Sequence, residues 1–168
     1  EATSFGAALL FEPWTIRTGQ GTAFSVYTPF WRACLSAPAP RTPGTAPRSI
    51  DGARPPRSPH VVTVDELGLL PSHPDWAGGL REAWVPGEKA AHQQLDRFLS
   101  GDLAAYRSDR DIPGVDATSR LSPRLRWGEL SPHQVWHAAS ARRDAARRDA
   151  ATAQSATTFL AELGWREF

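Results

Sequence analysis

The sequence predicts a mainly α-helical protein, and three segments carry this prediction. Residues 88–99 repeat apolar side chains at i, i+4, i+7 and i+8, the spacing of one helix face, at Ala91, Leu95, Phe98 and Leu99. Ser131 and Gln134 have the spacing of a capping box, in which two side chains satisfy free amides at a helix start. Residues 156–168 are expected to form the last helix.

The beginning of the chain is expected to be less regular. Residues 7–16 are apolar and contain Pro13, a pattern typical of a strand near the edge of a sheet. Thr28 and Pro29 then resemble a helix start, because a hydroxyl can cap free amides and proline lacks a donor that the first turn does not need. We expect this short helix to run to about Leu35.

A linker is predicted to follow. Residues 36–60 are rich in Pro, Ala, Arg, Ser and Gly, and such a composition buries too little apolar surface to order itself. A short element is expected within residues 61–70, with Asp65 near its start. Residues 71–84 are predicted to form a loop.

Helical patterns dominate the rest of the chain. Gly87 precedes the apolar helix described above, Gly101 interrupts it, and residues 103–106 are expected to continue as a second short helix. Residues 141–150 read ARRDAARRDA, with Asp144 and Arg148 spaced as an i,i+4 pair. A solvated helix face explains this run, and a patch for the DNA backbone is the alternative.

Residues 118–123 read TSRLSP and form a candidate phosphate site. Ser122 before Pro123 predicts a helix start, where free amides and the helix dipole favour an anion. An ordinary capped helix explains the same residues, so the run by itself leaves both interpretations open.

The last helix has an unusual inner face. Phe159, Glu162 and Trp165 follow one another at steps of three, and Arg166 lies four residues after Glu162. We therefore expect the four side chains to share one helix face. Charged groups are costly to bury unless they are paired or used. A buried salt bridge and a functional site are both consistent with this spacing.

Composition fits a helical globular protein without extreme charge. The net charge is +1, 40% of residues are hydrophobic, and Lys89 is the only lysine among 19 basic residues. No apolar run of about 20 residues is present, so no membrane span is expected. The single cysteine, Cys34, excludes an internal disulfide and suits a cytoplasmic protein. Glu129, His133 and His137 are spaced by four, but a cap at Ser131 puts Glu129 outside the helix, so no metal site is expected.

Several motifs occur in one order and resemble the DNA photolyase/cryptochrome family. They read YxxxRDxP from Tyr106, TSRLSP from Thr118, GELSP from Gly128 and ELGWREF from Glu162. Upstream, residues 10–14 (LFEPW) and 27–31 (YTPFW) resemble the end of that family's antenna domain. The resemblance covers nearly the whole chain, apart from roughly residues 36–83. It is to deoxyribodipyrimidine photolyases of the class I type.

The resemblance implies a domain layout. Residues 1–35 would end an α/β antenna domain with its last strand and helix, and residues 36–83 would be an interdomain linker. Residues 84–168 would be the first part of the helical FAD-binding domain. Because the chain lacks an initiator methionine and stops after its last motif, we expect an internal fragment of a larger protein. The fragment alone is expected to be inactive and to bind FAD weakly or not at all.

The resemblance also implies roles for individual residues. Glu162 would hydrogen-bond a flipped-out pyrimidine dimer, Trp165 would stack on it, and Arg110 would lie near the DNA. The remaining implied contacts hold the FAD, at Tyr106, Thr118, Ser119, Arg120, Leu121, Ser122, Phe159 and Arg166. Phe159 stands where the family often has tryptophan, so its role is the least secure.

The implied activity is light-driven repair of cyclobutane pyrimidine dimers in DNA by electron transfer from reduced FAD. The partners would be damaged DNA and, in the parent protein, an antenna chromophore such as a folate or a deazaflavin. A monomer is expected. The alternative is a cryptochrome-type blue-light receptor that binds FAD without repair, and a purely structural helical module that binds DNA is a third class. Glu162 together with Trp165 favours repair.

Overall fold

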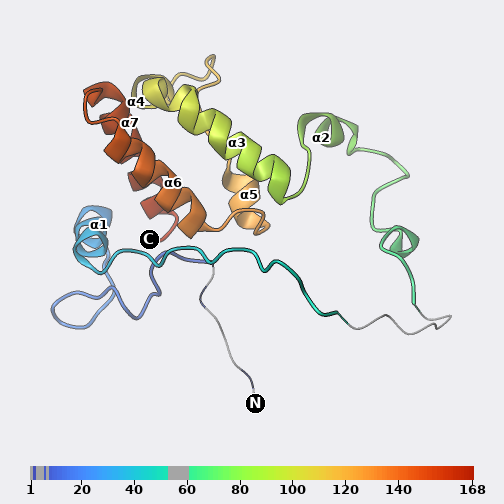
Figure 1. Cartoon of the computed structure of the whole chain (residues 1–168), viewed down its shortest axis with the longest axis horizontal. Coiled ribbons are helices and arrows are strands. Elements are labelled where there is room, and N and C mark those ends of the chain that lie inside the picture. Colours follow the sequence, from blue (N-terminus) through green and yellow to red (C-terminus); the bar gives the residue numbers. More distant parts are fainter. Residues whose placement is uncertain (1, 3–5, 7, 53–60) are drawn as a thin grey trace. The chain divides into compact units, whose positions relative to one another are not determined.

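The computed structural model describes residues 2, 6, 8–52 and 61–168. The chain forms two compact units, one made of residues 1–43 and 87–168 and the other of residues 44–86 (Figure 1). Every regular element among the described residues is a helix, which confirms the mainly α-helical prediction. Within the same residues, no helix is long and apolar enough to span a bilayer.

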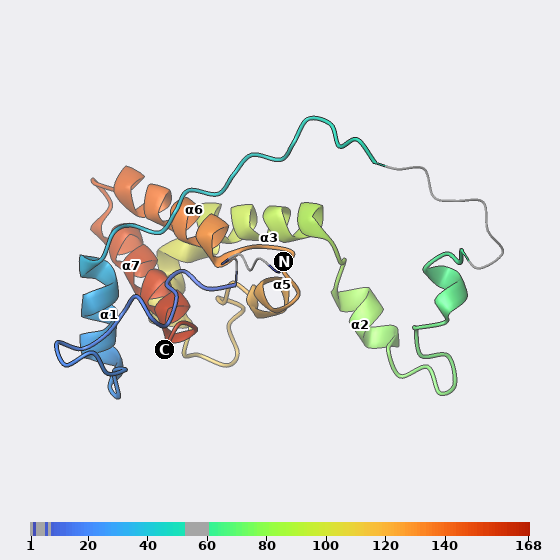
Figure 2. The ribbon, with the colours of Figure 1, turned by 90° about the horizontal axis from the view of Figure 1, so that it is seen from below.

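The first unit contains most of the helices. They are α1 (Tyr27–Ser36), α3 (Glu88–Ser100), the 3-10 helix η2 (Asp102–Ala105), α4 (Tyr106–Asp109), α5 (Ser122–Arg126), α6 (Pro132–Ala145) and α7 (Ala150–Trp165). Helix α7 packs against α6, η2, α4 and α1, and α3 packs against α6 and η2 (Figures 1 and 2). Helix α7 therefore contacts more of the other elements than any other helix does.

The second unit holds two short elements, the 3-10 helix η1 (Asp65–Leu67) and α2 (Gly78–Ala83). The expected short element beginning near Asp65 is thus confirmed, but the loop prediction for residues 71–84 is wrong in part. Asp75 explains the difference, because its carboxylate accepts from the amide of Ala77, 3.2 Å away, and pairs with Arg81 one turn into α2. Residues 53–60 of the predicted linker lie outside the described residues.

The core of the first unit follows the predicted apolar stripe. Ala91, Leu95 and Phe98 of α3 are buried, and Leu99 packs against them partly exposed. The same cluster continues through the other helices, at Leu103, Tyr106, Leu121, Leu130, Val135, Ala156, Phe159, Leu160 and Leu163. Burying each large apolar side chain contributes roughly 1.5–3 kcal/mol, so this cluster is the main stabilising feature of the unit.

Side chains cap the starts of helices α6 and α7. The capping box at α6 is confirmed: the Gln134 amide donates to the Ser131 hydroxyl at 3.2 Å, and the Ser131 amide donates to Gln134 Oε1 at 2.7 Å. Helix α7, however, begins at Ala150 rather than near residue 156. Asp149 caps it by accepting from the Thr152 amide at 3.1 Å, a start signal hidden in the Arg-rich run.

The strand predicted over residues 7–16 does not form in the part that the structure describes, residues 8–16, which make bends and turns. No second strand is present among the described residues to pair with it. Its backbone groups find other partners instead: the Thr15 amide donates to the Glu12 carbonyl at 2.8 Å, and Leu10 donates to the Glu167 side chain at 2.6 Å. Ala7 lies outside the described residues.

The start of the expected linker contacts helix α6. His137 Nε2 on α6 is 3.0 Å from the Pro40 carbonyl oxygen and 3.1 Å from that of Arg41, and residues 37–43 belong to the first unit. The division into antenna domain, linker and FAD-binding domain stays a prediction.

The run at residues 141–150 is not one helix face. Helix α6 ends at Ala145, and Arg148 lies in the turn before α7. Asp144 pairs with its neighbour Arg143 at 3.0 Å, so the expected pair of Asp144 with Arg148 is wrong. Arg142 donates from Nε to the Leu99 carbonyl at 3.1 Å and so ties α6 to the end of α3.

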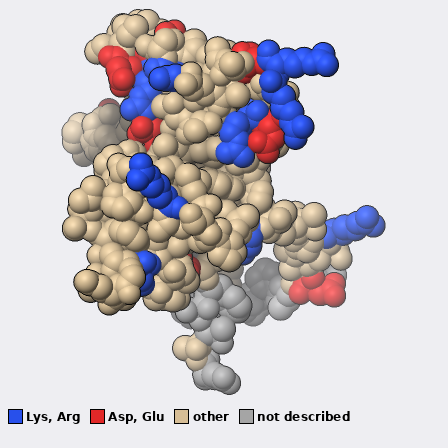
Figure 3. Space-filling model, turned by 90° about the vertical axis from the view of Figure 1, so that its left-hand side faces the viewer, with Lys and Arg blue, Asp and Glu red and all other residues tan. Residues whose placement is uncertain are grey.

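Charge on the visible surface is mixed in sign. On the face in Figure 3, basic and acidic side chains of the described residues lie next to one another instead of forming a broad field of one sign.

Helix α1 contacts α7 through a close approach at Gly164. Tyr27 donates its hydroxyl to the Ala161 carbonyl and stacks on the Trp165 ring, with centroids 3.7 Å apart and planes 10° apart. A Cβ at Gly164 would lie 2.5 Å from the Trp31 ring and 2.8 Å from Tyr27 Oη. Burial, with the charges of Glu162 and Cys34, raises the pKa of Tyr27 to about 12, so the phenol stays a donor at neutral pH.

The close approach at Gly164 can be tested by adding one methyl group. We expect Gly164→Ala to lower the free energy of unfolding by about 1–3 kcal/mol, because the new Cβ forces the Trp31 ring away from α7. Urea unfolding measures the change. Gly114→Ala is the control, because a Cβ there meets no atom within 4 Å and we expect a change within about 0.5 kcal/mol. Equal stability of the two variants would contradict this account of the contact between α1 and α7.

Candidate functional site

A large open cavity lies in the first unit, with a volume of about 1040 Å³. Its wall comes from the segment 8–9, Tyr106 of α4, residues within 118–135, and the inner face of α7. The size is at the upper end of what small-molecule sites show. The cavity brings together segments that are more than 150 residues apart.

Tyr106 forms an aromatic corner of the cavity. Its ring is 7% exposed and meets Phe98 and Phe159 edge-on, each with centroids 5.5 Å apart. The Arg110 guanidinium lies over the same ring at 5.7 Å from the centroid. Burial raises the pKa of Tyr106 although Arg110 opposes the shift, so the hydroxyl remains protonated at neutral pH.

The hydroxyl-rich loop 118–122 forms a second wall. All five residues from Thr118 to Ser122 line the cavity, so three hydroxyl-bearing residues stand in this wall. Arg120 has a φ of 51°, a left-handed conformation that L-residues adopt at a cost of roughly 1–2 kcal/mol. Its guanidinium lies 3.0 Å from Asp116 at the surface.

Helix α5 differs from the prediction for this loop. Leu121, with φ of −86°, precedes the helix, and Ser122 lies inside it without a side-chain cap. The helix is only five residues long, so its dipole is a weak source of positive potential. The helix start predicted at Ser122 and Pro123 is therefore confirmed without the expected side-chain cap, and the anion site stays a prediction that rests on the loop's hydroxyls and amides.

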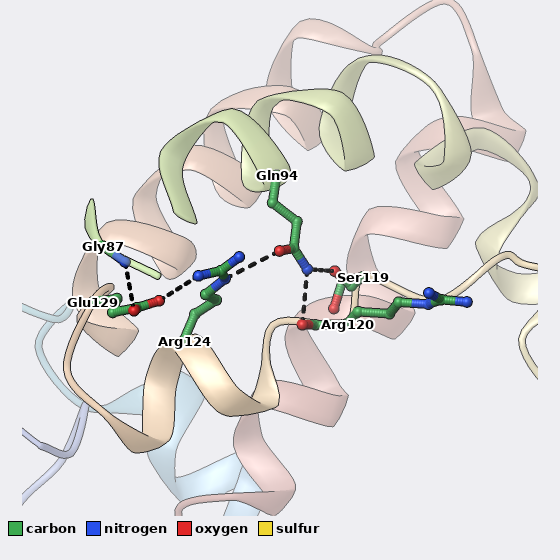
Figure 4. Close-up of polar contacts among 6 residues, drawn as sticks. All are labelled: Gly87, Gln94, Ser119, Arg120, Arg124 and Glu129. Atoms are coloured by element: carbon green, nitrogen blue, oxygen red, sulfur yellow. Dashed lines mark hydrogen bonds and ion pairs between the residues drawn. The ribbon is translucent and has the colours of Figure 1, made fainter. Parts of the chain in front are cut away.

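A polar network centred on the buried Arg124 lies behind the loop (Figure 4). The Gln94 side-chain amide of α3 donates to the carbonyls of Ser119 at 2.9 Å and Arg120 at 2.8 Å. Arg124 donates from Nε to Gln94 Oε1 at 3.1 Å and from an Nη to Glu129 at 2.6 Å. Glu129 also accepts from the Gly87 amide at 2.7 Å. The contact with Arg124, and then that with Gly87, lowers the pKa of Glu129.

The inner face of α7 presents three of its four predicted residues to the cavity. Phe159, Glu162 and Arg166 line it, whereas Trp165 is absent from the lining, is 51% exposed and stacks on Tyr27. At 100° per residue, Trp165 lies at the edge of this stripe, 120° from Phe159 and 100° from Arg166. The expectation that all four share one face is therefore wrong for Trp165.

Glu162 is held at the cavity by an ion pair. Its carboxylate lies 2.5 Å from an Nη of Arg110, and both side chains are partly buried. The hydrogen bond that Arg110 donates to Glu162 raises the pKa of Arg110. The structure thus joins the residue expected to face DNA with the residue expected to face the dimer.

The end of α7 fixes the segment at residues 8–11. Arg166 donates to the Ala8 carbonyl at 2.7 Å, and the Glu167 carboxylate accepts from the Leu10 amide at 2.6 Å and the Phe11 amide at 3.3 Å. Burial raises the pKa of Glu167, although the two amides and Arg166 oppose the shift. Because Ala8 and Leu9 line the cavity, these contacts position part of its wall.

The lining of the cavity is chemically compatible with a phosphate-bearing ligand that contains aromatic rings. Hydroxyls and loop amides occur on one wall, aromatic rings occur at Tyr106 and Phe159, and cationic Arg120 and Arg166 also belong to the lining. The amides of Arg120 and Ser122 have no hydrogen-bond partner in the described part of the chain, so they are free to bind an anion.

Metal binding has no support in this geometry. Among the residues that the structure describes, no group of three or more His, Cys, Asp or Glu side chains could hold an ion. Glu129 is engaged by Arg124 and Gly87, and His137 by the carbonyls of Pro40 and Arg41.

Comparison with known proteins gives the family. The family described as DNA photolyase matches residues 1–48. The deoxyribodipyrimidine photo-lyase of Agrobacterium fabrum is 40% identical over 98% of this chain and 33% of its own length. Cryptochrome-1 of Arabidopsis thaliana is 33% identical over 98% of this chain and 24% of its own length. The crystal structure of a bacterial class III photolyase from Agrobacterium tumefaciens matches with a TM-score of 0.84 and 40% identity, covering 98% of this chain and 33% of that one.

This chain belongs to the DNA photolyase/cryptochrome family, as its motifs indicated. It spans about a third of the length of curated photolyases that it matches. The structure that it resembles is of class III, whereas the motifs suggested class I, so the subclass does not follow from those motifs.

Sequence reasoning located most of the cavity but missed several of its parts. Trp127 lines the rim and is 79% exposed, and the RLRWGE context gave no sign of this position. Ala8 and Leu9 join the wall only through the long-range contacts of Arg166 and Glu167. Gln94 and Arg124 belong to no motif that would have marked them as part of the site. The ion pair of Arg110 with Glu162 joins residues 52 positions apart, so no local pattern predicts it.

The buried carboxyl of Glu167 generates a pH prediction. Because its pKa is raised in the folded state, ionisation opposes folding, and this cost is absent below the unfolded pKa and grows as pH rises through the folded pKa. We expect the stability of Glu167→Gln, relative to the unmodified protein, to increase from about pH 4 to about pH 7. Thermal unfolding across this range measures the difference. The exposed Glu82→Gln is the control, and a Glu167→Gln difference that is constant with pH would contradict the prediction.

Proposed function

We propose that the protein carrying this chain repairs cyclobutane pyrimidine dimers in DNA, driven by light and by reduced FAD. The observation that carries the proposal is the placement of Glu162, whose carboxylate lines the same cavity as the hydroxyl-rich loop 118–122 and Tyr106. An acceptor for the bases and a cradle for a phosphate-bearing cofactor thus share one space. When bound, reduced FAD supplies the electron that splits the cyclobutane ring and takes it back afterwards.

Glu162 is proposed to accept hydrogen bonds from the dimer's bases. Arg110 fixes the carboxylate through a 2.5 Å contact and leaves its remaining lone pairs available. Hydrogen bonds to a charged acceptor contribute about 1.5–3 kcal/mol, and they are strongest where water is excluded. The pair therefore orients the acid before DNA arrives.

The cofactor contacts follow from the lining of the cavity. Thr118, Ser119 and Ser122 would donate hydroxyls to phosphate or ribityl oxygens, with the Arg120 and Leu121 backbone between them. Three further residues would complete the site: Tyr106 and Phe159 through their rings, and Arg166 through its guanidinium. An antenna chromophore, either a folate or a deazaflavin, stays an expectation for the parent protein.

Trp165 has weaker geometric support than Glu162. Its ring stacks on Tyr27 and does not line the cavity, so it would stack on an extruded base only after leaving that contact. Arg110 is proposed to lie near the DNA backbone while holding Glu162. The proposal includes a monomeric, cytoplasmic enzyme.

The alternative is a blue-light receptor of the cryptochrome type, which would bind FAD without repair. Both photolyases and cryptochromes are among the relatives, so the family alone does not decide between them. The orientation of Glu162 into the cavity favours repair.

The decisive experiment illuminates thymine-dimer DNA with blue light in the presence of the full protein. Glu162→Gln keeps the size of the side chain but removes its charge, and we expect repair to fall by about tenfold to a hundredfold with FAD still bound. Trp165→Phe is the comparison, and the geometry predicts a smaller loss than at Glu162. Repair is measured as restored thymine per unit of light dose.

Two results would count against the proposal. Absence of repair by the unmodified protein with FAD bound would favour the receptor. Unchanged repair by Glu162→Gln would remove this acid from the mechanism.

A further inference from the structure

The carbonyl groups of the loop 118–122 are turned toward α3. Gln94 donates one side-chain amide to two successive carbonyls, at Ser119 and Arg120 (Figure 4). Gln94 itself does not line the cavity, whereas both loop residues do. The loop therefore separates Gln94 from the cavity.

This contact determines where the loop's amides point. In a trans peptide the N–H of one residue is opposite the carbonyl of the residue before it. With the carbonyls of Ser119 and Arg120 facing Gln94, the amides of Arg120 and Leu121 face the other side of the loop, where the Leu121 amide donates to the Ser119 hydroxyl at 3.4 Å and the Arg120 amide has no partner among the described residues. Arg120 has a φ of 51°, so the loop adopts a conformation that needs support from its surroundings.

Gln94 is in turn fixed by a buried cation. Arg124, 5% exposed, donates from Nε to Gln94 Oε1, which forces the amide nitrogen of Gln94 toward the loop. Glu129 holds Arg124 from the other side and is anchored by the Gly87 amide. The chain of contacts thus runs from the start of α3, through α5, to the loop.

We propose that Gln94 is a positioning residue for phosphate recognition, oriented by Arg124 and Glu129. It holds two carbonyls, which would repel an anion, away from the cavity and leaves the Arg120 amide to face it. The inference rests on the proposed function for the identity of the cofactor. Gln94, Arg124 and Glu129 would thus determine which backbone groups of the loop face the ligand, without touching the ligand themselves.

The test measures dissociation constants for FAD and for riboflavin, which lacks the phosphates, by flavin fluorescence in the full protein. Gln94→Glu keeps the side-chain length and the acceptor for Arg124 but cannot donate to the loop. We expect Gln94→Glu and Gln94→Leu to weaken FAD binding roughly tenfold, the effect of losing one to two hydrogen bonds, and to leave riboflavin binding within about twofold. Gln93→Leu, the same change on the exposed neighbour, is expected to match the unmodified protein.

Each contrary result has a distinct meaning. FAD affinities of the Gln94 variants equal to that of Gln93→Leu would overturn the positioning role and leave the proposed function intact. Equal losses for FAD and riboflavin would show general structural damage, which also overturns the role. Failure of the unmodified protein to bind FAD would overturn both the role and the proposed function.

Discussion

The close approach at Gly164 is the constraint on which the site depends. Because no side chain stands at this position, Tyr27 and Trp31 of α1 pack directly on α7, and the Tyr27 hydroxyl reaches the Ala161 carbonyl. That contact fixes the rotation of α7 about its axis. Phe159 and Glu162 then face the cavity, while the Trp165 ring is held on the α1 side.

The loop and short helix that line the cavity have little local stability of their own, and tertiary contacts hold them in place. Helix α5 is too short to create a strong field, and the left-handed Arg120 would be costly in isolation. A partly buried amide and a buried cation compensate for both, since Gln94 donates to the loop carbonyls and accepts from Arg124. Polar networks of this kind are valuable only when every member is paired, so they favour one conformation of the loop.

The sequence predicted the helices whose signals are local and missed features that depend on distant residues. The stripe from Ala91 to Phe98 and the capping box at Ser131 were read correctly because spacing alone defines them. The strand over residues 7–16 was wrong because apolar character cannot show whether a partner strand exists. Motifs located Glu162 and the loop, but only packing places Trp165 on Tyr27 and brings Arg110 to Glu162.

We propose that Arg110 and Glu162 act as one unit at the cavity. A double-mutant cycle with Arg110→Met and Glu162→Gln, read out as affinity for thymine-dimer DNA in the full protein, tests this most directly. If the pair acts together, removing the second partner adds little to the loss from removing the first, with a coupling of about 1 kcal/mol or more. Strictly additive losses would show that the two residues act independently and would contradict the account.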